Sequence, residues 1–121
     1  MSDTIKNISN DLKNFAIDRD WEQFHTPKNL SMALIAEAAE LVEHFQWLTP
    51  EQSKAISGEK LQDISYEMAD IFIYLLRMAE QLDVDLVAAT RKKMAINEKR
   101  FPAGFSSSEG TVQNHKDNKY S

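Results

Sequence analysis

The sequence contains no cysteine and little glycine or proline. Without cysteine, the chain cannot form disulfides, thiolate metal sites or a cysteine nucleophile. Three glycines and three prolines among 121 residues, with almost no alternation of β-branched and polar residues, favour helices over strands. The length suits one ordinary domain that builds its core without metal or disulfide cross-links.

Long apolar runs and an excess of positive charge are also missing. No apolar run reaches the length of a membrane span, and the polar residues 1–10 do not resemble a signal peptide, so we expect a cytoplasmic protein. Nineteen acidic residues against 14 lysines and arginines give a formal net charge of −5, which argues against a nucleic-acid polymer as partner. A small phosphorylated ligand remains compatible, because a few basic residues or cations neutralise it locally.

Apolar residues recur at helical spacing in four long segments. These predicted helices cover residues 4–18, residues 30–48, residues 59–82 and a fourth segment that follows a capping Asp83 or Asp85 and ends by Pro102. Thr49-Pro50-Glu51-Gln52 has the pattern of a capping box, so it predicts a short connecting helix, which Ser57-Gly58 would end.

The remaining segments lack this periodicity. Residues 19–29 (RDWEQFHTPKN) contain a proline and predict a loop, and residues 103–121 have the composition of a disordered tail. The expected fold is therefore all-α: a four-helix bundle with a short connecting helix, formed by one domain over residues 1–102.

The helix predicted over residues 59–82 has more apolar surface than one chain of this size would cover. Its apolar residues keep a three-four spacing, and Ile71 to Leu76 (IFIYLL) is apolar on nearly every side. Such a helix is expected to be buried all round, often at a subunit interface. We therefore expect a homo-oligomer.

Two acidic pairs, Glu37 with Glu40 and Glu67 with Asp70, interrupt otherwise apolar helices. A spacing of three residues places the members of a pair about 60° apart on one helix face. A single pair is most simply explained as solvated surface. Two pairs, with Asp70 next to IFIYLL, would bury several like charges, which costs several kcal/mol per ion unless cations compensate them.

The ligand type indicates which cation. Sites built from carboxylates alone suit Mg²⁺ or Mn²⁺ rather than zinc, and four carboxylates would balance two divalent cations. A di-iron centre in a helical bundle uses Glu-x-x-His on two helices. Here the residue three positions after the leading glutamate is Glu40 in one pair and Asp70 in the other, not histidine. The pattern therefore favours magnesium over iron.

A basic stripe and several aromatic residues could complete a nucleotide site. Lys93, Asn97 and Arg100 share one face of the last helix; alone they are most simply a solvated face, but opposite a cation cluster they would suit a polyphosphate. Aromatic side chains stack on nucleobases, although a loop tryptophan can equally pack on the edge of a bundle. The candidates for stacking are Trp21, Phe24, His25 and Trp47.

Four segments together resemble the all-α nucleotide pyrophosphohydrolases of the MazG type, most closely the small dCTP pyrophosphatase branch. In chain order they are RDWEQFHTPKNL, EAAELVEHFQW, EMADIFIYLL and KMAINEKRFP, within residues 12–102. The resemblance implies hydrolysis of a nucleoside triphosphate, dCTP or a modified dCTP, to the monophosphate and pyrophosphate. It also implies assembly as a dimer or as a tetramer made of two dimers.

The same resemblance assigns roles to individual residues. It implies a catalytic Mg²⁺ site, with Mn²⁺ possible, on Glu37, Glu40, Glu67 and Asp70. It implies base contacts from Trp21, His25, Trp47 and Tyr74, and phosphate contacts from Lys93, Asn97 and Arg100. Two alternatives stay open: the same reaction on another triphosphate such as dUTP, and a helical interaction module without catalytic activity.

Overall fold

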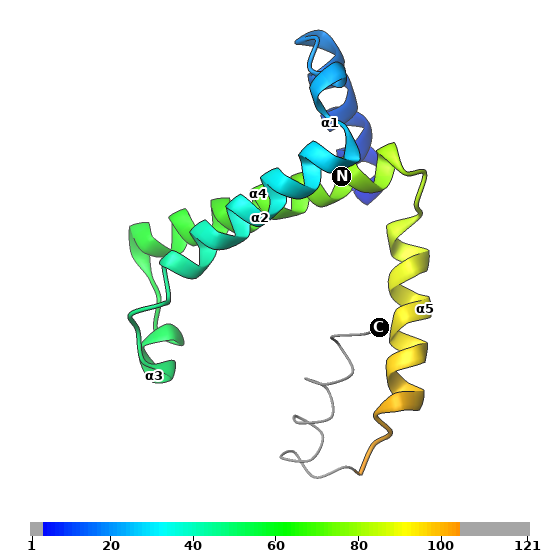
Figure 1. The fold of residues 1–121 in the computed structure, drawn as a ribbon. Coiled ribbons are helices and arrows are strands. Elements are labelled where there is room, and N and C mark those ends of the chain that lie inside the picture. Colours follow the sequence, from blue (N-terminus) through cyan, green and yellow to red (C-terminus); the bar gives the residue numbers. More distant parts are fainter. Residues whose placement is uncertain (1–3, 105–121) are drawn as a thin grey trace. The chain divides into compact units, whose positions relative to one another are not determined.

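The computed structural model describes residues 4–104, and within these residues it contains helices and turns but no strand (Figure 1). The elements are α1 (Ile5–Asp18), the 3-10 turn η1 (Glu22–Phe24), α2 (Pro27–Glu43), α3 (Pro50–Ser53), α4 (Gly58–Gln81) and α5 (Leu86–Arg100). The prediction of an all-α protein with four long helices and one short connecting helix is confirmed. The tail predicted from residue 103 lies, from residue 105 onward, outside the described residues.

The helices begin at polar caps that the sequence supplies. The side-chain oxygens of Thr4, Thr26 and Asp85 accept backbone N–H groups at the starts of α1, α2 and α5. At α3, Thr49 accepts the N–H of Gln52 and the Gln52 side chain accepts the N–H of Thr49, so the predicted capping box is present.

Three boundaries differ from the prediction. α2 begins at Pro27 rather than Leu30, because proline is well tolerated in a first helical turn that Thr26 caps. It ends at Glu43, after which i→i+3 bonds tighten the chain into turns, so Trp47 lies beyond the helix. Ser57-Gly58 does not end α3 but begins α4, with Gly58 at a φ of 64° that glycine adopts without strain.

α1 and α4 end in the same kind of turn. In each, an aspartate with left-handed φ (Asp20, 57°; Asp83, 55°) follows the C-cap residue. The next N–H reaches back five residues: Trp21 donates to the carbonyl of Ala16 at 2.9 Å, and Val84 to that of Ala79 at 2.8 Å. These are Schellman motifs, which reverse the chain sharply.

Residues up to Val84 form one compact unit, and a second begins at Asp85. In the first, α2 and α4 lie side by side and run antiparallel, and α1 packs on α4 (Figure 1). Its buried apolar residues are Ala16, Leu30, Ile64 and Leu76. The second unit is described through α5 alone. The prediction of a single domain over residues 1–102 stays a prediction.

α4 is not buried all round within this chain, as expected for a helix with more apolar surface than one chain of this size would cover. Ile64 and Leu76 are buried, but Met68, two turns before Leu75, is 58% exposed. An apolar stripe at three-four spacing is left open along α4, consisting of Leu61, Met68, Phe72, Leu75 and Leu82. Among residues 4–104, no helix is long and apolar enough to cross a membrane.

Candidate functional site

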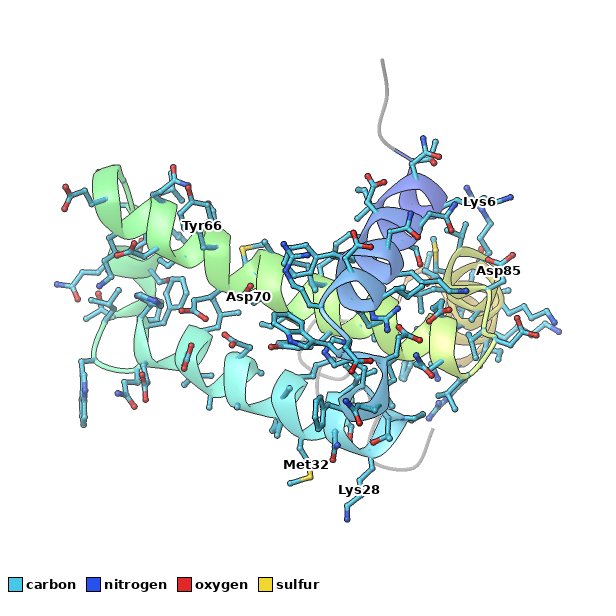
Figure 2. All side chains as sticks on the ribbon, turned by 90° about the horizontal axis from the view of Figure 1, so that it is seen from above. Lys6, Lys28, Met32, Tyr66, Asp70 and Asp85 are labelled. Atoms are coloured by element: carbon cyan, nitrogen blue, oxygen red, sulfur yellow. The ribbon has the colours of Figure 1, made fainter. Side chains whose placement is uncertain are left out.

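Three carboxylates meet between α2 and α4. Glu37 of α2 and Glu67 and Asp70 of α4 each offer one oxygen, and the three oxygens lie within 4.8 Å of one another. The antiparallel pairing of the helices places Glu37 opposite Glu67, and the three-residue spacing puts Asp70 on the same face of α4 as Glu67. Figure 2 shows Asp70 on the side of α4 that faces α2. The fold thus brings three of the four predicted acidic residues together, at partly buried positions.

Hydrogen bonding of the cluster is incomplete among residues 4–104. Glu37 Oε2 and Glu67 Oε2 are buried and have no hydrogen-bond partner within the part of the chain that the structure describes. Two ionised carboxylates that face each other contain no donor, so each oxygen keeps a lone pair unsatisfied. Buried oxygens in this state fit a hard divalent cation, which would satisfy both at once.

Glu40, the fourth predicted ligand, lies one turn further along α2 and is exposed. It is not one of the three residues whose oxygens converge. It still acts on the cluster, because its carboxylate can share a hydrogen with Glu37 and its negative charge disfavours ionisation of Glu37.

These neighbours raise the pKa of Glu37 from its ordinary value of 4.5 to about 7. The largest cause is a hydrogen bond that protonated Glu37 shares with Glu67, followed by burial, a hydrogen bond with Glu40, and the charges of Glu40 and Asp70. Without a cation, the cluster therefore retains a proton close to neutral pH. A divalent cation would displace that proton.

A cavity of about 280 Å³ adjoins the cluster, and Asp70 lines both. Its polar wall comes from Trp21, His25, Asp70, Tyr74 and Arg77, and its apolar wall from Leu12, Phe15, Ala16 and Ile73. Burial, and then the negative charges of Glu37 and Asp70, raise the pKa of Tyr74 above its ordinary value. Three of the four predicted base contacts are thus brought together, beside the acidic cluster.

The turn after α1 places Trp21 at this cavity. The Schellman motif directs its backbone to Ala16, and its ring meets Phe15 edge-on at a centroid distance of 5.6 Å. The ring of His25 lies 6.1 Å from that of Trp21, tilted by 52°. Trp21 is 43% exposed, so one part of the indole remains free to meet a ligand.

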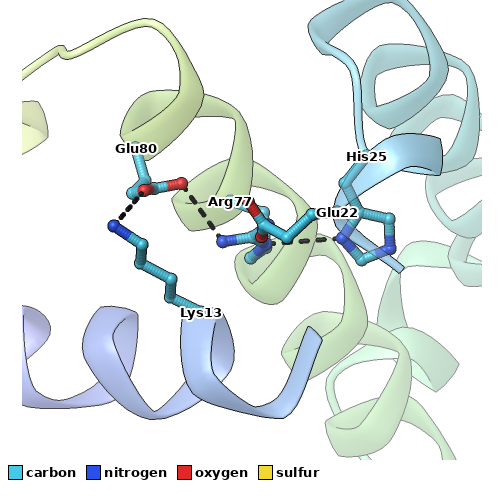
Figure 3. A network of polar contacts seen from close by, with 5 residues as sticks. All are labelled: Lys13, Glu22, His25, Arg77 and Glu80. Atoms are coloured by element: carbon cyan, nitrogen blue, oxygen red, sulfur yellow. Dashed lines mark hydrogen bonds and ion pairs between the residues drawn. The ribbon is translucent and has the colours of Figure 1, made fainter. Parts of the chain in front are cut away.

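Arg77 joins the Trp21–His25 segment to α4 (Figure 3). It is only 2% exposed, and its Nη1 donates to Glu80 Oε2 at 3.1 Å and its Nη2 to Glu22 Oε1. Its Nε donates to His25 Nδ1 at 3.4 Å. Glu80 also pairs with Lys13 of α1, at 3.4 Å. Arg77 and Glu80 of α4 together therefore connect this helix to residues 22–25 and to α1.

Sequence reasoning missed Arg77 and Glu22. The available signal was a single arginine directly after IFIYLL, since a charge within so apolar a run has to find partners when it is buried. Glu80 lies within one helical turn of Arg77, but the other two partners come from 52 and 55 positions earlier, and local spacing does not show such pairs.

The remaining predicted contacts are Trp47 and three residues of α5. Trp47 is 86% exposed and is not among the described residues that line the cavity. Lys93, Asn97 and Arg100 are in the second unit, where all three are partly buried and share one face of α5, as predicted. Arg100 also lies over the ring of Phe101, at 5.4 Å.

The sequence model of the MazG-like family matches residues 32–111. The chain belongs to the MazG-like family. It is 41% identical to human dCTP pyrophosphatase 1 over 102 residues, and the match covers 83% of this chain but 60% of that protein. The rat protein of the same name is 38% identical over 105 residues, with 85% and 62% covered. The chain thus spans about three fifths of the length of these relatives.

A solved structure shows the same fold. A pyrophosphatase from Archaeoglobus fulgidus superposes with a TM-score of 0.73 at 31% sequence identity, and the alignment covers 84% of this chain and 95% of that one. The family inferred from the four motif segments and the all-α architecture predicted from helical spacing are both confirmed.

Proposed function

We propose that this chain hydrolyses a nucleoside triphosphate between the α and β phosphates, releasing the monophosphate and pyrophosphate, with dCTP or a modified dCTP as the preferred substrate. The observation that carries the proposal is that Asp70 belongs both to the three-carboxylate cluster and to the wall of an aromatic cavity. A cation site and a base-sized cavity with a common wall suit a nucleotide. The names of the mammalian relatives support dCTP as its identity.

Glu37, Glu67 and Asp70 would hold Mg²⁺ or Mn²⁺, and the donor set fits because all three supply oxygen and two buried oxygens lack partners. When bound, such cations stabilise charge on the phosphates and lower the pKa of a bound water. Glu40 is the fourth acid of the site in this proposal. It would take the proton of the attacking water, a role supported by its exposure beside Glu37 and outside the converging trio.

The base and the phosphates of the substrate would be held by neutral and basic side chains. Trp21 would stack on the base, and His25 and Tyr74 would contact it within the cavity. Lys93, Asn97 and Arg100 would supply donors and positive charge to the phosphates, a role that suits the shared face of these residues on α5.

The proposal includes a homo-oligomer, a dimer or a tetramer made of two dimers. It is supported by the open apolar stripe of α4 and by a second stripe on α2, formed by Met32, Ile35 and Val42, which are all more than half exposed. Figure 2 shows Met32 on the side of α2 away from α4. A second copy would cover such stripes, and it would give the exposed Trp47 a partner surface. A cytoplasmic location stays a prediction.

The direct test is pyrophosphate release from a panel of dCTP, 5-methyl-dCTP, dUTP, dTTP, dATP and dGTP with Mg²⁺. We expect release that is fastest with a cytosine nucleotide, and equimolar monophosphate. Glu43→Gln is the matched control for Glu67→Gln, since Glu43 is an exposed acid of α2 outside the cluster. Absence of pyrophosphate with every nucleotide would overturn the proposal and favour the interaction module. If pyrophosphate were released fastest from dUTP, the proposed reaction would stand and only the preferred substrate would change.

A further inference from the structure

The contact with Arg77 determines which ring nitrogen of His25 carries the hydrogen. The guanidinium of Arg77 has donors but no acceptor, so the nitrogen that it meets, Nδ1 of His25, must accept. A neutral imidazole that accepts at Nδ1 carries its hydrogen on Nε2. Figure 3 shows the second ring nitrogen on the side of the imidazole away from Arg77.

The charged form of His25 is disfavoured in this setting. Burial and then the positive charge of Arg77 lower the pKa of His25, and Glu22 opposes them. Asp70 and Tyr74 are the other ionisable groups that line the same cavity. The imidazole therefore meets a ligand as a neutral group with one N–H.

The geometry points to Arg77 as a positioning residue for base recognition: it fixes His25 in the tautomer that offers an Nε2–H donor to an acceptor on the nucleobase edge. This inference rests on the proposed function and specifies the substrate that it takes. A pyrimidine with a carbonyl or imine acceptor at that edge, as cytosine has at O2 and N3, would accept from His25. An edge that offers only a donor there would leave two hydrogens facing each other.

A solely structural role does not account for all three contacts of Arg77. Glu22 and Glu80 already neutralise its charge, and they tie it to η1 and to α4. The third contact, from Nε to a neutral imidazole, adds no charge compensation. Its consequence is the orientation and tautomer of His25, in a cavity that both residues line.

The tautomer can be read without nucleotide or turnover, by ¹⁵N-resolved NMR of the imidazole in the full chain. We expect wild-type His25 to show the Nε2–H pattern near neutral pH. In Arg77→Lys the pattern should change to a mixture of tautomers. Because removal of an unmatched buried cation can unfold a chain, the double variant Glu22→Gln with Arg77→Met, which removes both charges together, is the second test. An unchanged tautomer in both variants would overturn the inference.

Kinetics then decide whether the tautomer serves recognition. Arg77→Lys should raise KM for dCTP about three- to tenfold, as expected for one lost hydrogen bond, and change kcat by less than about twofold. Glu80→Gln is the matched control, because it also removes a partner of Arg77 but does not touch His25; KM should stay within about twofold.

A double-mutant cycle separates the two roles. If Arg77 acts through His25, then Arg77→Lys should have no further effect on KM in a His25→Ala background. Equal, additive effects in both backgrounds would show that Arg77 is only structural. Failure of the wild type to release pyrophosphate from any nucleotide would count against the proposed function, whereas the NMR result would still decide whether Arg77 sets the tautomer.

Discussion

Glu37 and Glu67 face each other across the antiparallel pair of α2 and α4, and each has a buried oxygen, Oε2, for which residues 4–104 supply no donor. The two residues are 30 positions apart, and only the pairing of the helices makes them neighbours. Their proximity makes the chain's stability depend on what lies between them, a proton or a cation. The predictions on pH and on charge removal follow from this relationship.

The stability of the cation-free protein should fall as pH rises from about 4.5 to about 7. The folded-state pKa of Glu37, about 7, lies above its ordinary value of 4.5, so in this window the folded state binds more protons than the unfolded state. The loss should be about 1–3 kcal/mol, because one pKa unit corresponds to about 1.4 kcal/mol and Glu37 is only partly buried. Thermal melts in EDTA between pH 4.5 and 8 measure this loss.

Glu37→Gln should flatten the dependence of stability on pH, and Mg²⁺ should raise the stability of the wild type most at the upper end of this pH range. Equal slopes of stability against pH in the variant and the wild type would contradict the assignment to Glu37.

Removing one charge from the cluster should separate activity from folding. Glu67→Gln and Asp70→Asn each keep the side-chain shape but lose a ligand, so turnover should fall more than about a hundredfold. The melting temperature of the cation-free protein should rise, since like charges then repel less. Glu43→Gln should leave both quantities unchanged. A variant that kept wild-type turnover would exclude that residue from the cation site.

Asp83→Gly should stabilise the chain by about 0.5–1 kcal/mol. Asp83 holds a left-handed φ of 55° in the Schellman motif that ends α4, a conformation that glycine adopts without strain, and its negative charge lies at the negative end of the helix. Urea denaturation measures the gain. Asp83→Asn removes the charge but keeps a side chain, so comparison of the two variants separates electrostatics from backbone strain. Loss of stability in the glycine variant would refute the strain argument.

The open stripe of α4 should hold the oligomer together. Light scattering should return a multiple of 13.9 kDa for the wild type, and Met68→Glu or Phe72→Glu should shift it toward that mass. Ile17→Glu is the matched control, since Ile17 is also an exposed apolar residue but lies on α1, off the stripe. A wild-type particle of 13.9 kDa at micromolar concentration would rule out the proposed assembly.

The two tryptophans should respond differently to nucleotide. Trp21 lines the cavity and Trp47 is exposed, so in Trp47→Phe the remaining fluorescence should still change when dCTP is added with Ca²⁺, a hard cation used to hold the nucleotide. Trp21→Ala should raise KM about ten- to a hundredfold, as expected for about 1–3 kcal/mol of lost stacking, while kcat falls much less. Trp47→Ala should raise KM only if a second copy covers this residue, and a monomeric Met68→Glu background tests that condition.

Local signals in the sequence predicted local structure well. Thr49 with Gln52 gave the capping box, and Asp85 was one of two candidate caps, because a cap depends on residues within one turn. Pro27 led to a wrong prediction of the start of α2, since proline ends some helices and begins others. Here the hydroxyl of Thr26 caps the helix, and Pro27 stands in its first turn. The acids could be found because two pairs at equal spacing on apolar helices are hard to explain as surface.

Contacts across long sequence separations were not predictable in this way. The hydrogen bond of Arg77 to His25 and its ion pair with Glu22 depend on where the turn after α1 meets α4, and Asp20 sets that turn through its backbone conformation. The exposure of Trp47 depends on α2 ending four residues before it. The spacing rules assumed that the helix continued to residue 48 and therefore included Trp47 in it.

Asp70 is a wall of the cavity and a member of the carboxylate cluster at once. Two ligands that share a residue are linked thermodynamically. If a bound cation changes the affinity for a base in the cavity by some factor, a bound base changes the affinity for the cation by the same factor. A nucleoside that carries no phosphate should therefore still alter the metal titration of this chain. The change in cation affinity would measure the coupling between base and cation through Asp70 in a ligand that has no phosphate.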